Sequence, residues 1–116
     1  MKIGDLVLRT GVNARLLRYY EEQGLLTSYR AAGGHRRYTE DTPDIVRRIR
    51  ILLAAGLTTN TIRGVLGCVH SSEPELGKCV VPPLQTRLAS IDDQIAGLLA
   101  TRSALTALLD SASQVP

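Results

Sequence analysis

The sequence contains few aromatic residues, cysteines and histidines. Its 116 residues include no Trp, no Phe, four Tyr, two Cys and two His. Because disulfide frameworks belong to Cys-dense secreted domains, two cysteines do not predict one, and reduced thiols are the expected resting state. No motif joins either histidine to a nucleophile and an orienting residue, so we do not expect an enzyme.

Long apolar runs are also missing. The longest run, residues 51–57, has seven residues, whereas a membrane-spanning helix needs about 20. The first residues contain no apolar signal core. The sequence therefore predicts a cytoplasmic protein that does not bind membranes.

Basic charge is concentrated in the first half of the chain. Residues 1–64 hold 11 Lys and Arg against 6 Asp and Glu, while residues 65–116 hold 3 against 5. All four tyrosines lie in the first third. Basic and aromatic side chains in one segment favour a polyanionic partner for the first half.

Two short helices joined by a tight turn are predicted near the N-terminus. Apolar residues at helical spacing predict a helix over residues 3–9 that ends at Thr10-Gly11. Asn13 is a suitable N-cap for a second helix over residues 14–23. This is the helix-turn-helix pattern, whose second helix enters the major groove of DNA.

The adjacent tyrosines of the second helix must face different ways, because neighbouring helical residues are about 100° apart. Val12, Leu16 and Tyr20 follow one another at intervals of four and predict the buried side. The opposite side carries Arg15, Arg18, Tyr19 and Glu22, and we call the first three of these residues the arginine stripe. The stripe is either a DNA-facing surface or an ordinary solvated helix face, and the helix-turn-helix context favours DNA.

Each basic residue of this region has an expected role. Arg15, near the helix start, suits base readout, because Arg matches O6 and N7 of guanine. Arg18 and Tyr19 are expected to hold phosphates. Lys2, at the open start of the first helix, is a further phosphate candidate, and Asn13 could contact DNA although its capping role already explains it.

A basic β-hairpin, or wing, is predicted next. Gly33-Gly34 can supply the positive φ angles of a tight turn between residues 29–30 and 36–38. Since side chains alternate along a strand, Arg36 and Tyr38 share one face and Arg37 lies on the other. Only one face can point at DNA.

Two more helices and a linker follow the wing. Thr39 is the predicted N-cap of a third helix that has Pro43 in its first turn. A fourth helix is expected from Thr58 to Leu66, and residues 67–82, rich in Gly, Pro and Ser, form a linker. The third helix is expected to expose Arg47, Arg48 and Arg50 on a solvated face.

The last segment predicts a long helix over residues 83–112, followed by a tail at 113–116. Its apolar residues recur at intervals of four and three, with Arg102 as the one polar member of the pattern. Its apolar part, the 27 residues from Leu84 to Asp110, would be about 40 Å long and could not bury this stripe alone. We therefore expect a homodimer through a seam formed by Leu84, Leu88, Ile91, Ile95, Leu98, Leu105 and Leu109.

The chain resembles the MerR family of bacterial transcription regulators. The likeness covers about residues 2–66 and rests on four motifs. They are Ile3-Gly4-Asp5-Leu6, Thr10-Gly11-Val12, Leu17-Arg18-Tyr19-Tyr20-Glu21-Glu22-Gln23-Gly24-Leu25-Leu26 and Gly34-His35-Arg36-Arg37-Tyr38-Thr39-Glu40. The resemblance implies a mainly α fold, with a winged helix-turn-helix domain over residues 1–66 and an antiparallel coiled coil that joins two copies.

The resemblance also implies a function. Members of this family bind two-fold-related promoter sites, and they bend and untwist the DNA so that RNA polymerase can engage it. In the family's wing motif, residues matching Arg36 and Tyr38 grip the DNA backbone, which favours these two over Arg37. The chain ends after the dimer helix, so the likeness is to a short form without an appended effector domain.

The linker cysteines admit three interpretations. Cys79 lies just before the dimer helix, where metal-sensing relatives place a ligand, and His70 follows Cys68 closely. A metal site would need further ligands, for which only Glu73 and Glu75 are near. The alternatives are a reversible disulfide or thiol switch and two ordinary linker thiols, so no cofactor is expected.

The sequence is also compatible with two rival functions. An excisionase-like or architectural protein would bend DNA without controlling a promoter. A coiled-coil assembly module would use the seam alone, and its basic head would be incidental.

Overall fold

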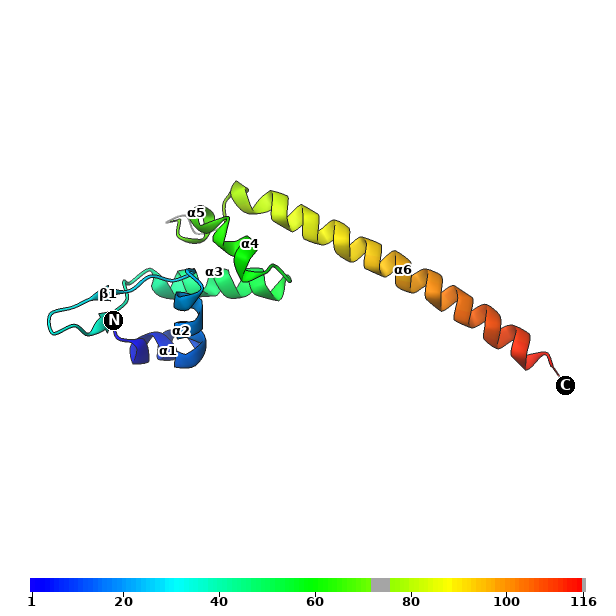
Figure 1. Ribbon diagram of the computed structural model, residues 1–116, viewed down its shortest axis with the longest axis horizontal. Coiled ribbons are helices and arrows are strands. Elements are labelled where there is room, and N and C mark those ends of the chain that lie inside the picture. Colours follow the sequence, from blue (N-terminus) through cyan, green and yellow to red (C-terminus); the bar gives the residue numbers. More distant parts are fainter. Residues whose placement is uncertain (72–75, 116) are drawn as a thin grey trace. The chain divides into compact units, whose positions relative to one another are not determined.

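The computed structural model describes residues 1–71 and 76–115, most of which are helical (Figure 1). Two compact units are present, Met1–Leu84 and Gln85–Pro116. The elements are α1 (Ile3–Thr10), α2 (Ala14–Glu22), β1 (Tyr29–Arg30), β2 (Arg36–Arg37), α3 (Thr42–Ala54), α4 (Thr59–Arg63), α5 (Leu66–Val69), η1 (Lys78–Val80) and α6 (Val81–Ser113). The predicted fold class, a winged helix-turn-helix followed by a long helix, is confirmed.

The helix-turn-helix forms as its local signals predict. Gly11 ends α1 with φ 70°, and the Asn13 side chain accepts a hydrogen bond from the Leu16 backbone N–H at 2.8 Å. The predicted core side of α2 needs one correction. Leu17 is fully buried, whereas Leu16 is only partly buried, because α2 presents a wider apolar stripe to the core than a single row at intervals of four.

The wing is a two-stranded antiparallel hairpin that pairs Tyr29 with Arg37 and Arg30 with Arg36. Its turn uses Gly33 at φ 88° and the following glycine at φ 80°, as predicted. The chain continues the pairing beyond β2. The Tyr38 N–H donates to the Met1 carbonyl at 2.7 Å, and the amino group of Met1 donates to the Tyr38 carbonyl at 2.6 Å, so the first residue is fixed to the wing.

Helix α3 begins three residues after the predicted cap. Its first residue is Thr42, and Asp41 rather than Thr39 holds the N-cap position. This start places Pro43 within the first turn, where its missing N–H costs no helical hydrogen bond. Thr39 instead hydrogen-bonds the Asp41 carboxylate and lies 3.2 Å from the Thr42 hydroxyl.

The segment predicted as a linker is partly folded into the first unit. The predicted fourth helix is divided into α4, capped by Thr58 as expected, and the separate α5. Val69 of α5 and Val80 of η1 are buried in the core. The compact unit therefore extends well beyond residue 66, to Leu84.

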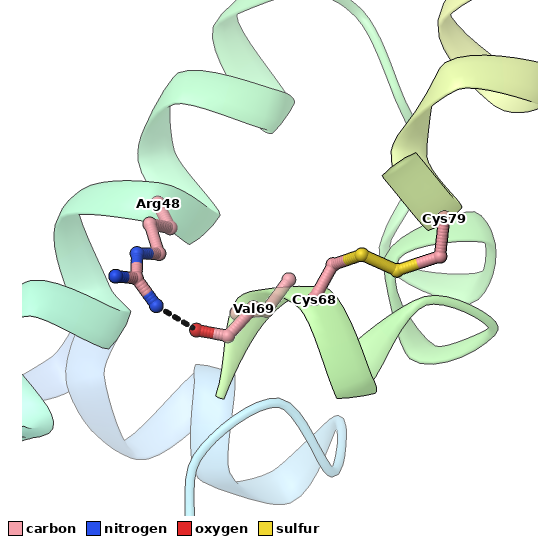
Figure 2. The surroundings of a disulfide bond; sticks show 4 residues. All are labelled: Arg48, Cys68, Val69 and Cys79. Atoms are coloured by element: carbon pink, nitrogen blue, oxygen red, sulfur yellow. Dashed lines mark hydrogen bonds between the residues drawn. A yellow bond between two sulfur atoms is a disulfide. The ribbon is translucent and has the colours of Figure 1, made fainter. Parts of the chain in front are cut away.

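Arg48 is buried, contrary to the prediction that it lies on a solvated face. Arg48 is 4% exposed, and its guanidinium donates to the Val69 carbonyl at 3.0 Å (Figure 2). It also donates to the Ser71 carbonyl at 2.5 Å. A buried cation is tolerated when carbonyl oxygens satisfy its N–H groups. Arg48 thus joins α3 to the end of α5.

Helix α6 begins two residues before the predicted start, at Val81, because a Pro is tolerated in the first turn of a helix. Leu84 packs against the core of the first unit. Farther along, seam residues such as Leu98, with 71% of its surface exposed, are uncovered in the single chain. Among residues 1–71 and 76–115, no helix is both long and apolar enough to cross a membrane.

Candidate nucleic-acid interface

The tyrosine pair on α2 divides as the helical phase predicts. Tyr20 is 2% exposed and belongs to the core, while Tyr19 is 44% exposed. Their ring centroids lie 6.4 Å apart, so the buried ring supports the exposed one. Arg15 and Arg18 are exposed on the same helix.

The start of the arginine stripe borders a shallow pocket of about 300 Å³. Asn13, Arg15, Leu16 and Tyr19 line it. The exposure of Leu16 is thus explained, because this side chain forms part of the surface around the stripe. The pocket brings together three of the predicted contact residues, from the N-cap of α2 to Tyr19.

The arginines of the stripe carry unneutralised charge. Within the part of the chain that the structure describes, no carboxylate pairs with Arg15 or Arg18, whereas Arg9 and Arg47 each have an acidic partner. An exposed cation without an internal partner is available to a phosphate or a base edge. This surface is chemically suited to DNA.

Tyr38 does not lie where a DNA backbone could reach it, so its assignment as a phosphate contact is corrected. The side chain is fully buried, and its hydroxyl donates to Glu21 Oε1 of α2 at 3.0 Å. Burial raises the pKa of Tyr38, and the Glu21 carboxylate raises it further, while Arg36 opposes the shift. The phenol therefore stays protonated and remains a donor.

Arg36 shares the same partner, because its guanidinium lies 3.4 Å from Glu21 Oε2. Strand alternation was correctly predicted to place Arg36 and Tyr38 on one face, but that face points at α2. Glu21 was not singled out from the sequence. It lies four residues after Leu17, on the core side of the same helix, which is the signal that could have identified it.

The opposite face of the wing carries Arg37 and Tyr29. They are cross-strand partners and so project to the same side. Tyr29 is 51% exposed. Lys2 is close to the wing as well, because a second shallow pocket, of about 310 Å³, is lined by Lys2, Ile3, His35, Arg36 and Arg37. The structure thus groups Lys2 with the wing.

The linker cysteines are joined as a disulfide, so the expectation of reduced thiols is wrong for this structure. Cys68 and Cys79 have Cα atoms 6.1 Å apart (Figure 2), within the usual disulfide range. His70 places Nε2 2.8 Å from the Leu25 carbonyl, so this ring nitrogen is already engaged.

The described residues give no support to the hypothesis of a metal site. Among residues 1–71 and 76–115, no group of three or more His, Cys, Asp and Glu could hold an ion. Glu73 and Glu75, the remaining ligand candidates, lie outside the described residues.

Comparison with protein families matches residues 1–67 to the family described as MerR HTH family regulatory protein. The mercuric resistance operon regulatory protein of Bacillus cereus is 37% identical over 73 residues, covering 62% of this chain and 55% of that protein. The nodulation protein NolA of Bradyrhizobium elkanii is 43% identical over 63 residues, covering 53% of this chain and 29% of that protein. This chain thus spans about half or less of these two relatives.

Two solved structures extend the likeness along the chain. The transcription regulator PbrR691 from Ralstonia metallidurans CH34, in complex with lead(II), aligns with TM-score 0.68 and 30% identity over 96% of this chain and 87% of that one. HiNmlR, a regulator lacking the sensor domain and bound to promoter DNA, aligns with TM-score 0.52 and 21% identity over 97% and 83%. The second likeness supports the fold alone.

Proposed function

Since the chain belongs to the MerR HTH family of regulatory proteins, we propose that it binds promoter DNA as a homodimer and controls transcription from that promoter. The family match covers residues 1–67 of the first unit, which include the helix-turn-helix and the wing. The observation that carries the proposal is the exposed arginine stripe of α2, whose arginines have no carboxylate partner within the described residues.

The contacts divide between bases and phosphates. Arg15, near the N-terminal end of α2, reads a guanine in the major groove, because recognition helices contact base edges with their N-terminal residues. Arg18 and Tyr19 hold the adjacent phosphates. On the wing, Arg37 and Lys2 are better placed for the backbone than the buried Tyr38.

The seam of α6 supplies the second copy. Its apolar residues are uncovered in the single chain: Leu88, Ile95, Leu98, Leu105 and Leu109 are 49–71% exposed. Pairing two such helices buries the seam and gives two recognition helices related by a two-fold axis. The DNA site is then two-fold related as well. Contacts on two half-sites allow the dimer to bend and untwist the intervening DNA. RNA polymerase can then engage the reshaped promoter.

The test is binding to the promoter nearest the coding region, measured by fluorescence anisotropy between about 50 and 200 mM salt. Arg18→Ala removes one phosphate contact per protomer, so the slope of log affinity against log salt should fall by about 1.8 for the dimer. Arg15→Ala should instead weaken discrimination at one base pair in each half-site, by about 1–3 kcal/mol.

The control is Arg47→Ala, which removes an exposed arginine from α3, where it lies 4.0 Å from Asp44. This variant should keep the wild-type slope. If the salt slope of Arg47→Ala fell as much as that of Arg18→Ala, net charge rather than the arginine stripe would govern binding. Binding and bending that leave transcription from the promoter unchanged would instead favour an architectural protein.

A further inference from the structure

Cys68 and Cys79 differ sharply in exposure. Cys68 is 6% exposed and belongs to the core, whereas Cys79 is exposed on η1. Among the described residues, the Cys79 side of the bond is therefore the more accessible to a thiol or disulfide in solution. Thiol–disulfide exchange depends on which sulfur is accessible to the attacking thiolate.

The two cysteines lie on segments with different attachments. Cys68 lies in α5, next to Val69, whose carbonyl Arg48 holds at 3.0 Å (Figure 2). Cys79 lies in η1, two residues before α6 begins at Val81. The bond therefore connects the anchored α5 directly to the base of α6.

The backbone at Gly77 passes very close to the Cys68 sulfur. A Cβ atom at Gly77 would lie 3.0 Å from the Cys68 sulfur, so only glycine lets the chain pass over that sulfur without displacing it. Val80 is buried beside this point. The segment that carries Cys79 is thus held close to Cys68 by packing as well as by the bond.

We propose that this pair is a reversible redox site that exchanges with small-molecule disulfides and thiols, and that its bond clamps the base of α6. The Cys79 thiolate attacks a small-molecule disulfide, forms a mixed disulfide and releases one thiol. The Cys68 thiolate then attacks the Cys79 sulfur, forms the internal bond and releases the second thiol. The protein loses two electrons and two protons, and the small disulfide gains them.

The reverse reaction begins when an external thiolate attacks the exposed Cys79 sulfur. That this bond is reversible in the cell rests on the proposed function, whereas the other steps do not. Transcription takes place where thiols are kept reduced, and disulfides formed there are usually transient and redox-sensing. Oxidation then changes how firmly η1 is held, at the point where the dimer helix starts.

Mass spectrometry of the reduced full chain treated with oxidised glutathione tests the order of the two steps. Wild type should close without retaining an adduct. Cys68→Ser should accumulate glutathione on Cys79, and Cys79→Ser should react at least about tenfold more slowly because its remaining thiol is buried. A wild type that stays open or retains the adduct, or equal rates for the two variants, would overturn the assignment.

Tryptic cleavage after Lys78, which is exposed in η1, tests the clamp without DNA. Oxidised wild type should be cleaved several-fold more slowly than reduced wild type, whereas the double variant Cys68→Ser/Cys79→Ser should not respond to glutathione. Equal cleavage of both wild-type forms would refute the clamp.

Affinity for promoter DNA, compared between the two wild-type forms, then measures the regulatory consequence. The two forms should differ at least about threefold, and the double variant should show no such difference; equal affinities would refute regulation by this site. A protein that binds no DNA in either form would refute the proposed function, while adduct formation and cleavage would still decide the redox site.

Discussion

Removal of one hydroxyl, by Tyr38→Phe, should loosen the attachment of the wing to α2. The substitution keeps the buried ring and deletes the hydrogen bond to Glu21, whose length is 3.0 Å. A bond to a charged acceptor contributes about 1.5–3 kcal/mol. Glu21 keeps Arg36 at 3.4 Å, and its side chain is 18% exposed, so water can replace part of the loss. We expect the free energy of unfolding at pH 7 to fall by about 1–2 kcal/mol.

The measurement is urea denaturation at one fixed protein concentration, because the stability of the proposed dimer would depend on concentration. Tyr19→Phe is the matched control. It deletes the same atom from an exposed side chain, and its effect should remain within about 0.5 kcal/mol. Equal effects of the two substitutions would contradict the role of the Glu21 contact.

The same contact predicts a dependence on alkaline pH. Burial and Glu21 raise the pKa of Tyr38 above its ordinary value, which is about 10. The folded protein therefore holds this proton more tightly than the unfolded chain does. The resulting stability is complete below about pH 10 and is lost as pH rises through the folded pKa. Wild type should lose stability more steeply than Tyr38→Phe in this range, and parallel curves would refute the argument.

DNA binding distinguishes a positioning role from a contact role for Tyr38. If the hydroxyl only positions the wing, Tyr38→Phe should weaken binding a few-fold without changing the salt slope, because no phosphate contact is lost. A slope that falls by about 1.8, as expected for Arg18→Ala, would instead mean that Tyr38 touches phosphates in the complex.

Two further substitutions test the core and the seam, each against a matched control. Arg48→Met removes the Arg48 donor from the buried Val69 carbonyl and from the partly buried Ser71 carbonyl. It should lower the free energy of unfolding by about 2–4 kcal/mol, whereas Arg47→Met on the exposed side should change it by less than about 0.5. Similar effects would contradict the structural role of Arg48. Leu98→Glu should raise the dimer dissociation constant at least about a hundredfold in sedimentation experiments, because each buried Leu contributes about 1.5–3 kcal/mol. Ser103→Glu, on the outer side of α6, should leave it unchanged; an unaffected Leu98→Glu dimer would rule out the seam.

Features governed by local interactions were predictable from the sequence. The Asn13 cap, the glycine turn of the wing and the helical phase that separates Tyr19 from Tyr20 depend on residues a few positions apart. Backbone sterics and helical periodicity determine such features wherever the segment lies in the fold. The long helix was predictable for the same reason, although it starts two residues earlier and ends one residue later than predicted.

Features governed by tertiary contacts were not predictable in this way. Strand alternation correctly grouped Arg36 with Tyr38, but alternation does not say which face meets a neighbouring helix. The acceptor that fixes this choice is Glu21, 17 positions before Tyr38. The predicted exposure of Arg48 was wrong for a similar reason. The carbonyls that permit its burial come from Val69 and Ser71, more than 20 residues away.

The prediction that residues 67–82 form only a linker was wrong, and the reason is relevant to regulation. Gly, Pro and Ser between residues 67 and 82 remove helical periodicity, but a segment without periodicity can still pack. Val80 and Leu84 pack on the core, and the Cys68–Cys79 bond joins the segment to α5. The base of α6 is therefore part of the DNA-binding unit. A chemical change at Cys79 would act two residues from the start of the helix that carries the seam, so the proposed redox site could influence the proposed dimer without a separate sensor domain.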